Sequence, residues 1–149
     1  MTILYVNNAA AHVDHGKYHD FRASKQSIEL QKMQDFHLQQ AKDKLHKKEF
    51  THAWGDLAYL LCHVPNHHLA LQHMLTLTPQ LHKEAEMREY LNKAVTLFPE
   101  DAVVHMLYGA FLHNIGEDKD GAKHLRIANE LSVKPSLKGS PRKSLTIQR

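Results

Sequence analysis

A chain of 149 residues has the length of one domain, and with 42% hydrophobic residues it can bury a sizeable core. It contains no apolar run of about 18 residues, so we predict no membrane-spanning helix. The formal charge at pH 7 is +3, but five basic residues and no acidic residue follow Val133, which leaves 1–133 at −2. The positive charge therefore belongs to a tail, which argues against a nucleic-acid-binding face.

The first part of the chain mixes short apolar stretches with polar and histidine-rich ones and shows no steady period. We therefore expect an irregular segment over 1–23. The opening MTILYVNNAAAH lacks the basic start and the long apolar stretch of a secretory signal peptide. This favours a cytoplasmic protein, with the periplasm as the alternative compartment.

The stretch HVDHGK at 12–17 looks like the phosphate-binding loop of translational GTPases. Such a loop needs a glycine at its start and a serine or threonine hydroxyl after the lysine to hold Mg²⁺. This chain has Ala11 and Tyr18 at those two positions, and nothing downstream has the pattern of a βαβ unit. We therefore predict no nucleotide site and no cofactor.

A helical pattern of apolar residues begins after Ser24 and continues to about Lys47. The residues that carry its first part are Ile28, Leu30, Met33 and Phe36. The pattern predicts an N-terminal helix that precedes the first repeat described below and runs into it.

Small and apolar residues recur along the rest of the chain with a period equal to the spacing between Pro65 and Pro99. Both prolines follow such residues at the same offsets. Residues three or four apart share one face of a helix, and proline ends a helix because it lacks an N–H and clashes with the preceding turn. The recurring positions are Ala53, Leu57 and Leu60; Met87, Leu91 and Ala94; Gly121, Leu125 and Ala128; and, one helix earlier, Ala41, Leu75 and Gly109. A period of this length predicts stacked helix–turn–helix units, with an ordinary helical bundle as the alternative.

These residues make the chain resemble the tetratricopeptide repeat family. The resemblance implies an all-α fold, an α-solenoid of three repeats at about 34–67, 68–101 and 102–135 within a domain over 24–135. The aromatic residue usual early in the first helix of a repeat is replaced by His37, Leu71 and His105. The second repeat departs further, with Leu75 at the small position and Met87 at the alanine position.

In this family the first helix of each repeat lines a concave groove that takes extended or helical peptides. The resemblance places the groove at Asp35, Leu38, Lys42, Leu69, Gln72, Thr76, Val103, Met106, Ala110 and His113. Only Lys42 belongs to the residue types that clamp a terminal carboxylate, so an apolar peptide or amphipathic helix fits better. The alternative is that the segment 1–33 fills this groove within the same chain.

Repeat arrays need polar caps, because the apolar face of each unit is covered only by the next unit. No further helix is expected after Val133, where the chain reads as a disordered basic tail over 136–149. The last repeat would then leave an apolar face partly open, at Leu125, Ile127, Ala128 and Leu131. We therefore expect a homo-oligomer or a stable protein partner on this face.

Histidine occurs 14 times, which raises the question of a metal site. His63, His67 and His68 around Pro65 are the best candidates on spacing, but they match no known ligand signature. We interpret most histidines as surface or packing residues and predict no metal site. The lone Cys62 reads as a buried small hydrophobe. No set of residues in the sequence has a catalytic pattern, so we do not expect an enzyme.

The sequence as a whole predicts a soluble, non-enzymatic protein-interaction module or assembly adaptor, without a membrane span or a nucleic-acid partner. One alternative is a secretion chaperone with three repeats, which the chain resembles in size and in its apolar groove. Another is a histidine-rich metal-binding protein.

Overall fold

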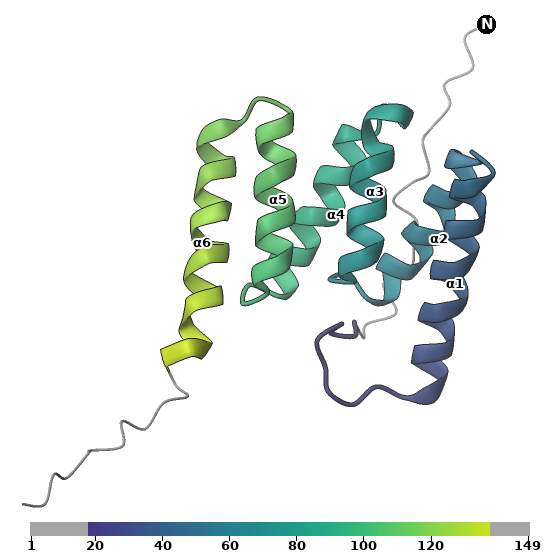
Figure 1. Ribbon diagram of the computed structural model, residues 1–149, viewed down its shortest axis with the longest axis horizontal. Coiled ribbons are helices and arrows are strands. Elements are labelled where there is room, and N and C mark those ends of the chain that lie inside the picture. Colours follow the sequence, from purple (N-terminus) through teal and green to yellow (C-terminus); the bar gives the residue numbers. More distant parts are fainter. Residues whose placement is uncertain (1–17, 138–149) are drawn as a thin grey trace, which may run out of the picture. The chain divides into compact units, whose positions relative to one another are not determined.

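The computed structural model describes residues 18–137, with side-chain exposure for 18–133. This part of the chain holds six helices and no strand, which confirms the all-α prediction (Figure 1). The helices are α1 (Ile28–His46), α2 (Phe50–His63), α3 (His68–Leu81), α4 (Glu84–Leu97), α5 (Ala102–Asn114) and α6 (Asp118–Leu137). The starts of α2, α4 and α6 are evenly spaced, and the same spacing separates the starts of α3 and α5. This spacing equals that between Pro65 and Pro99, so the period in the sequence recurs in the helix boundaries.

The helix expected before the first repeat is not a separate element. Ile28 lies in the first turn of α1, which continues unbroken to His46 because no proline or glycine interrupts it. Ser27 caps this helix, its hydroxyl accepting a hydrogen bond from the amide of Leu30 at 3.1 Å. The first repeat unit therefore begins with a longer helix than the other units.

The helix ends predicted at Pro65 and Pro99 are found, whereas the last helix does not end with the third repeat, which was predicted over about 102–135. The residues before Pro65 and Pro99 leave the helical region, with φ of −129° at both Val64 and Phe98. In contrast, α6 passes through Pro135 to Leu137. The tail predicted to begin at residue 136 is therefore still helical over its first two residues, and 138–149 lie outside the described part of the chain.

The chain divides into two compact units, Met1–Pro99 and Glu100–Arg149, and each is considered by itself. In the first unit α1 packs on α2, α2 on α3, and α3 on α4. The core of this unit contains most of the repeat positions derived from the sequence, all 0% exposed: Ala41, Ala53, Leu57, Leu60, Met87, Leu91 and Ala94. The predicted register thus identifies buried residues, although a continuous solenoid of three repeats remains a prediction.

The second unit is a helical hairpin in which α5 packs on α6. The two helices approach closely where Gly109 faces Gly121, because a Cβ atom at Gly109 would lie 2.9 Å from the carbonyl oxygen of Gly121. The side chain of Asp101 caps α5 and accepts hydrogen bonds from the amides of Val103 and Val104. The close approach of the two backbones therefore explains why a small residue, Gly109, is needed in the middle of α5.

Candidate binding clefts

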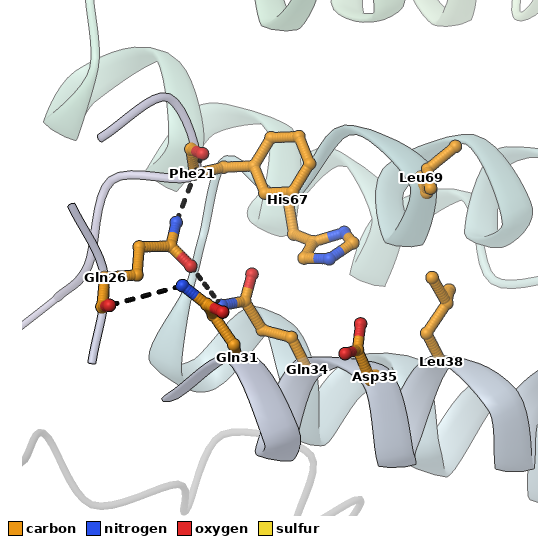
Figure 2. A pocket seen from close by; sticks show the side chains of 8 residues that line it. All are labelled: Phe21, Gln26, Gln31, Gln34, Asp35, Leu38, His67 and Leu69. Carbon is orange, nitrogen blue, oxygen red and sulfur yellow. Dashed lines mark hydrogen bonds between the residues drawn. The ribbon is translucent and has the colours of Figure 1, made fainter. Parts of the chain in front are cut away.

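The first unit contains an open cleft of about 310 Å³ between α1, the start of α3 and the segment before α1 (Figure 2). We call it the α1–α3 cleft. Its lining combines apolar and amide side chains with one carboxylate: Phe21, Gln26, Gln31, Gln34, Asp35, Leu38, His67 and Leu69. Its size suits one or two side chains of a peptide better than a large cofactor.

One end of this cleft is formed by the irregular segment before α1, which is tied to the turn between α2 and α3. The amide of Phe21 donates to Oδ1 of Asn66 at 2.8 Å, and Nδ2 of Asn66 donates to Oδ1 of Asp20 at 2.8 Å. Asn66 is fully buried, and the ring of Phe21 lies 4.4 Å from the ring of His67. These contacts place Phe21 at the cleft although it lies 45 residues from Asn66 in the chain.

A network of glutamine side chains holds the same segment against α1. Nε2 of Gln34 donates to Oε1 of Gln26 at 2.6 Å, and Nε2 of Gln26 donates to the carbonyl oxygen of Phe21 at 3.2 Å. Nε2 of Gln31 donates to the carbonyl oxygen of Gln26 at 3.3 Å. The amide donors of the cleft are thus used inside the protein, as the dashed lines in Figure 2 show.

The polar groups left for a ligand are therefore mainly acceptors. Asp35 is exposed, and its carboxylate forms no hydrogen bond or ion pair with any residue between 18 and 137. It lies on α1 one turn before Leu38, with Leu69 of α3 facing both across the cleft (Figure 2). Because Leu38 is half-buried and Leu69 is 42% exposed, the cleft offers an acceptor beside an apolar surface.

His67 has a structural position at the bottom of this cleft. It is 3% exposed, and its Nδ1 accepts a hydrogen bond from the amide of Ala70 at 3.2 Å, which caps α3. Burial lowers the pKa of His67 to about 4, with a smaller contribution from the neighbouring His68. The ring is therefore neutral near pH 7, as its acceptor role in the cap requires.

The three histidines singled out as metal candidates have other contacts. Nδ1 of His67 is used in the cap of α3, and Nδ1 of His63 lies 3.0 Å from the carbonyl oxygen of Tyr59. The ring of His68 packs edge-on against Phe21 at 4.9 Å. Within the described residues no three histidine, cysteine, aspartate or glutamate side chains are placed to share a metal ion.

The groove residues predicted in the first unit fall partly inside the α1–α3 cleft. Asp35, Leu38 and Leu69 line it, whereas Lys42, on α1, and Gln72 and Thr76, on α3, do not. The predicted groove did not include the glutamines of the cleft. Gln31 and Gln34 lie one helical turn before Asp35 and Leu38, and this spacing could have identified them. Phe21 and Gln26 gave no such signal, because long-range contacts bring their segment to the cleft.

The second unit has its own apolar groove of about 250 Å³, between α5 and α6. We call it the α5–α6 groove; it is lined by Ala102, Val103, Met106, Leu125, Ala128, Asn129 and Ser132. The predicted groove residues Val103 and Met106 belong to it, while Ala110 and His113 are exposed further along α5. Leu125 and Ala128, predicted for the open face of the last repeat, also line this groove; Leu125 is 42% exposed, whereas Ala128 is buried, so the prediction is wrong for Ala128.

A pair of histidines joins α5 to α6 beside this groove. Nδ1 of His105 lies 2.9 Å from Nδ1 of His124, and the ring of Tyr108 lies 4.4 Å from that of His124. One ring must donate and the other accept, so the contact requires that at least one ring be neutral. Burial, followed by the proximity of His105, lowers the pKa of His124.

No protein-family model matches the sequence, and no curated protein matches it either. None of the helices in the described part of the chain is long and apolar enough to span a bilayer.

Proposed function

We propose that the chain is a non-enzymatic protein-interaction module whose α1–α3 cleft binds an apolar peptide segment. The observation that carries the proposal is the juxtaposition of Leu38 and Leu69 with the carboxylate of Asp35 in one open cleft. Burying the exposed parts of the two leucines would supply affinity at about 25 cal/mol per Å². The acceptors around them would orient a peptide N–H or a basic side chain.

The resemblance to tetratricopeptide repeats supports the same proposal independently of the cleft. It predicted Asp35, Leu38 and Leu69 as ligand-facing, and none of the predicted groove residues is buried in the structure. Among residues 18–99, no helix covers the face that the family uses for peptides, and Phe21 closes one end of it. A ligand would enter beside Leu69 and stop at Phe21.

The test is a selection of binders from a random peptide library, followed by affinity measurements on the full chain. Leu69→Glu places a charge in the cleft and should weaken the selected peptides at least tenfold. Leu97→Glu is the matched control, because Leu97 on α4 is 39% exposed, close to the 42% of Leu69, and lies outside the cleft.

Both variants should keep the helical circular-dichroism spectrum of the wild type, since both side chains are already partly in water. Peptides that bind wild type and Leu69→Glu equally well would overturn the proposal. So would a library that yields no binder with the wild-type chain.

A further inference from the structure

The lining of the α1–α3 cleft contains two buried polar side chains that each keep one atom without a hydrogen bond. The first is Gln34, which is 5% exposed and whose Nε2 donates to Oε1 of Gln26 and to the carbonyl oxygen of Leu30. Its Oε1 forms no hydrogen bond with a residue between 18 and 137. Among the fully buried side-chain nitrogen and oxygen atoms of the described residues, only Nδ1 of His37 lacks a partner, so Oε1 of Gln34 must reach the open cleft.

The second of these side chains is His67. Its neutral ring accepts a hydrogen bond from the amide of Ala70 at Nδ1, so the proton of the ring lies on Nε2. Although His67 is 3% exposed, this Nε2–H has no hydrogen bond to any other residue of the described stretch 18–137. By the same reasoning it has access to the cleft, where Figure 2 shows the ring between Phe21 and Asp35. A buried donor and a buried acceptor that reach one open cleft are groups that a ligand can pair.

Asp35 adds a negative charge beside these two groups. It directly follows Gln34 on α1, and both side chains line the cleft. Burial lowers the pKa of His67 to about 4, and the charge of Asp35 partly opposes this effect, so the carboxylate acts on the ring across the cleft. We call Gln34, Asp35 and His67 the polar end of the cleft. It offers a ligand one carboxylate, one amide oxygen and one N–H group.

We propose that the polar end binds the guanidinium group of an arginine in the peptide ligand, an inference that rests on the proposed function. A guanidinium group is planar and can donate two parallel hydrogen bonds to a carboxylate, here that of Asp35. A further N–H of the same group can donate to Oε1 of the neighbouring Gln34. The Nε2–H of His67 is then left to donate to a carbonyl oxygen of the ligand backbone.

Other side chains suit the polar end less well. A lysine ammonium group also carries a positive charge, but it cannot form the two parallel bonds to Asp35. An acidic side chain would bring two carboxylates together, which disfavours the charged form of both. A glutamine side chain could pair with Gln34, but it would leave the charge of Asp35 without a counter-charge. Charge complementarity therefore selects arginine.

The apolar part of the cleft fixes the neighbouring positions of the peptide. Leu38 follows Asp35 by one helical turn, a separation of about 5–6 Å between Cβ atoms. In an extended peptide, side chains two residues apart point to the same side and are about 6.6 Å apart. An arginine bound at Asp35 therefore places an apolar side chain two residues away between Leu38 and Leu69. Lys42, one turn beyond Leu38, would repel an arginine at the opposite end of this face.

The experiment measures the binding of short synthetic peptides to the full chain by fluorescence anisotropy at about pH 7.5, where His67 is neutral. One pair of peptides carries an arginine two residues before or after a leucine in a glycine–serine background. A second pair carries glutamine in place of the arginine. The wild type should bind the better arginine peptide about tenfold more tightly than its glutamine counterpart, and added salt should reduce this preference.

Two variants of Asp35 test its role in this preference. Asp35→Asn removes the charge and keeps the shape, so it should abolish the preference for arginine and leave the affinity for the glutamine peptide almost unchanged. Asp35→Lys should reverse the preference, so that a peptide with glutamate in place of the arginine binds more tightly than the arginine peptide.

The matched control is Asp43→Asn, which removes the same charge from the same helix. Asp43 is exposed and lies outside the cleft, and asparagine keeps the oxygen that accepts a hydrogen bond from Nε2 of Gln39. This variant should keep the wild-type preference for arginine. All these variants change exposed side chains, and circular dichroism checks that each one is folded.

Three results would overturn the inference. They are a wild type that binds the arginine peptides no better than the glutamine peptides, a preference that Asp35→Asn leaves unchanged, and a preference that Asp43→Asn removes as well. Its failure is distinguishable from that of the proposed function. Library peptides that need Leu69 but no arginine would refute this inference alone. An arginine preference that Leu69→Glu leaves intact would refute the apolar contact alone.

Discussion

His67 lies almost entirely out of water and still has to accept a hydrogen bond, so α3 can begin where it does only while this ring is neutral. The same burial affects other histidines of the first unit, since it also lowers the pKa of His37 and His73. At the residue scale, then, the unusual histidine content is linked to packing. The sequence suggested this for His37, but it offered His67 as a metal candidate.

The first prediction concerns acid stability. Because the pKa of His67 is about 4 in the folded chain, below its ordinary value of 6.5, the unfolded chain binds this proton first as the pH falls. The contribution of His67 is complete above pH 6.5 and is lost between pH 6.5 and 4, up to about 3 kcal/mol of unfolding free energy. Urea denaturation followed by circular dichroism between pH 7.5 and 4 measures it.

The matching variant is His67→Asn, which keeps an N-cap acceptor and removes the titrating ring. It loses the contact with Phe21 and should be less stable at pH 7.5, but its stability should fall less steeply towards pH 4. Equal slopes for the variant and the wild type would show that His67 is protonated equally in the folded and unfolded states. The slope that remains would report the other buried histidines.

At the scale of helices, the second prediction compares two glycines inside helices, of which one is tightly packed and the other has open space around it. Gly109→Ala should destabilise the hairpin of α5 and α6 by about 1–3 kcal/mol, although alanine favours a helix. Its Cβ atom would lie 2.7 Å from Cγ of Leu125 and 2.9 Å from the backbone oxygen of Gly121, and the backbone cannot move aside cheaply. The midpoint of urea denaturation measures the loss.

Gly55→Ala is the control for this prediction. Gly55 lies inside α2, is exposed, and has no atom within 4 Å of the added Cβ. The substitution should therefore stabilise the chain by about 0.5–1 kcal/mol through helix propensity alone. If both variants shifted stability in the same direction, the close approach of α5 and α6 would not be the cause.

The elements also show how far sequence reasoning reaches. The repeat period predicted where α2 and α4 end, because Pro65 and Pro99 act locally on the backbone. It did not predict that α6 continues past Pro135, where the clash affects only the last turn of a long helix. Part of the cleft lining was predicted, since the positions of Leu38 and Leu69 follow from helical register. The position of Phe21 could not be predicted, because it depends on the distant side chain of Asn66.

At the scale of the whole molecule, the positive charge can be separated from the helices by removing 138–149. A chain that ends at Leu137 keeps all six described helices, but it loses the basic residues Lys138, Arg142, Lys143 and Arg149. Its formal charge falls from +3 to −1, so it should no longer bind a cation-exchange resin at pH 7. A shortened chain that still binds the resin at pH 7 would contradict this prediction, because the positive charge would then lie within 1–137.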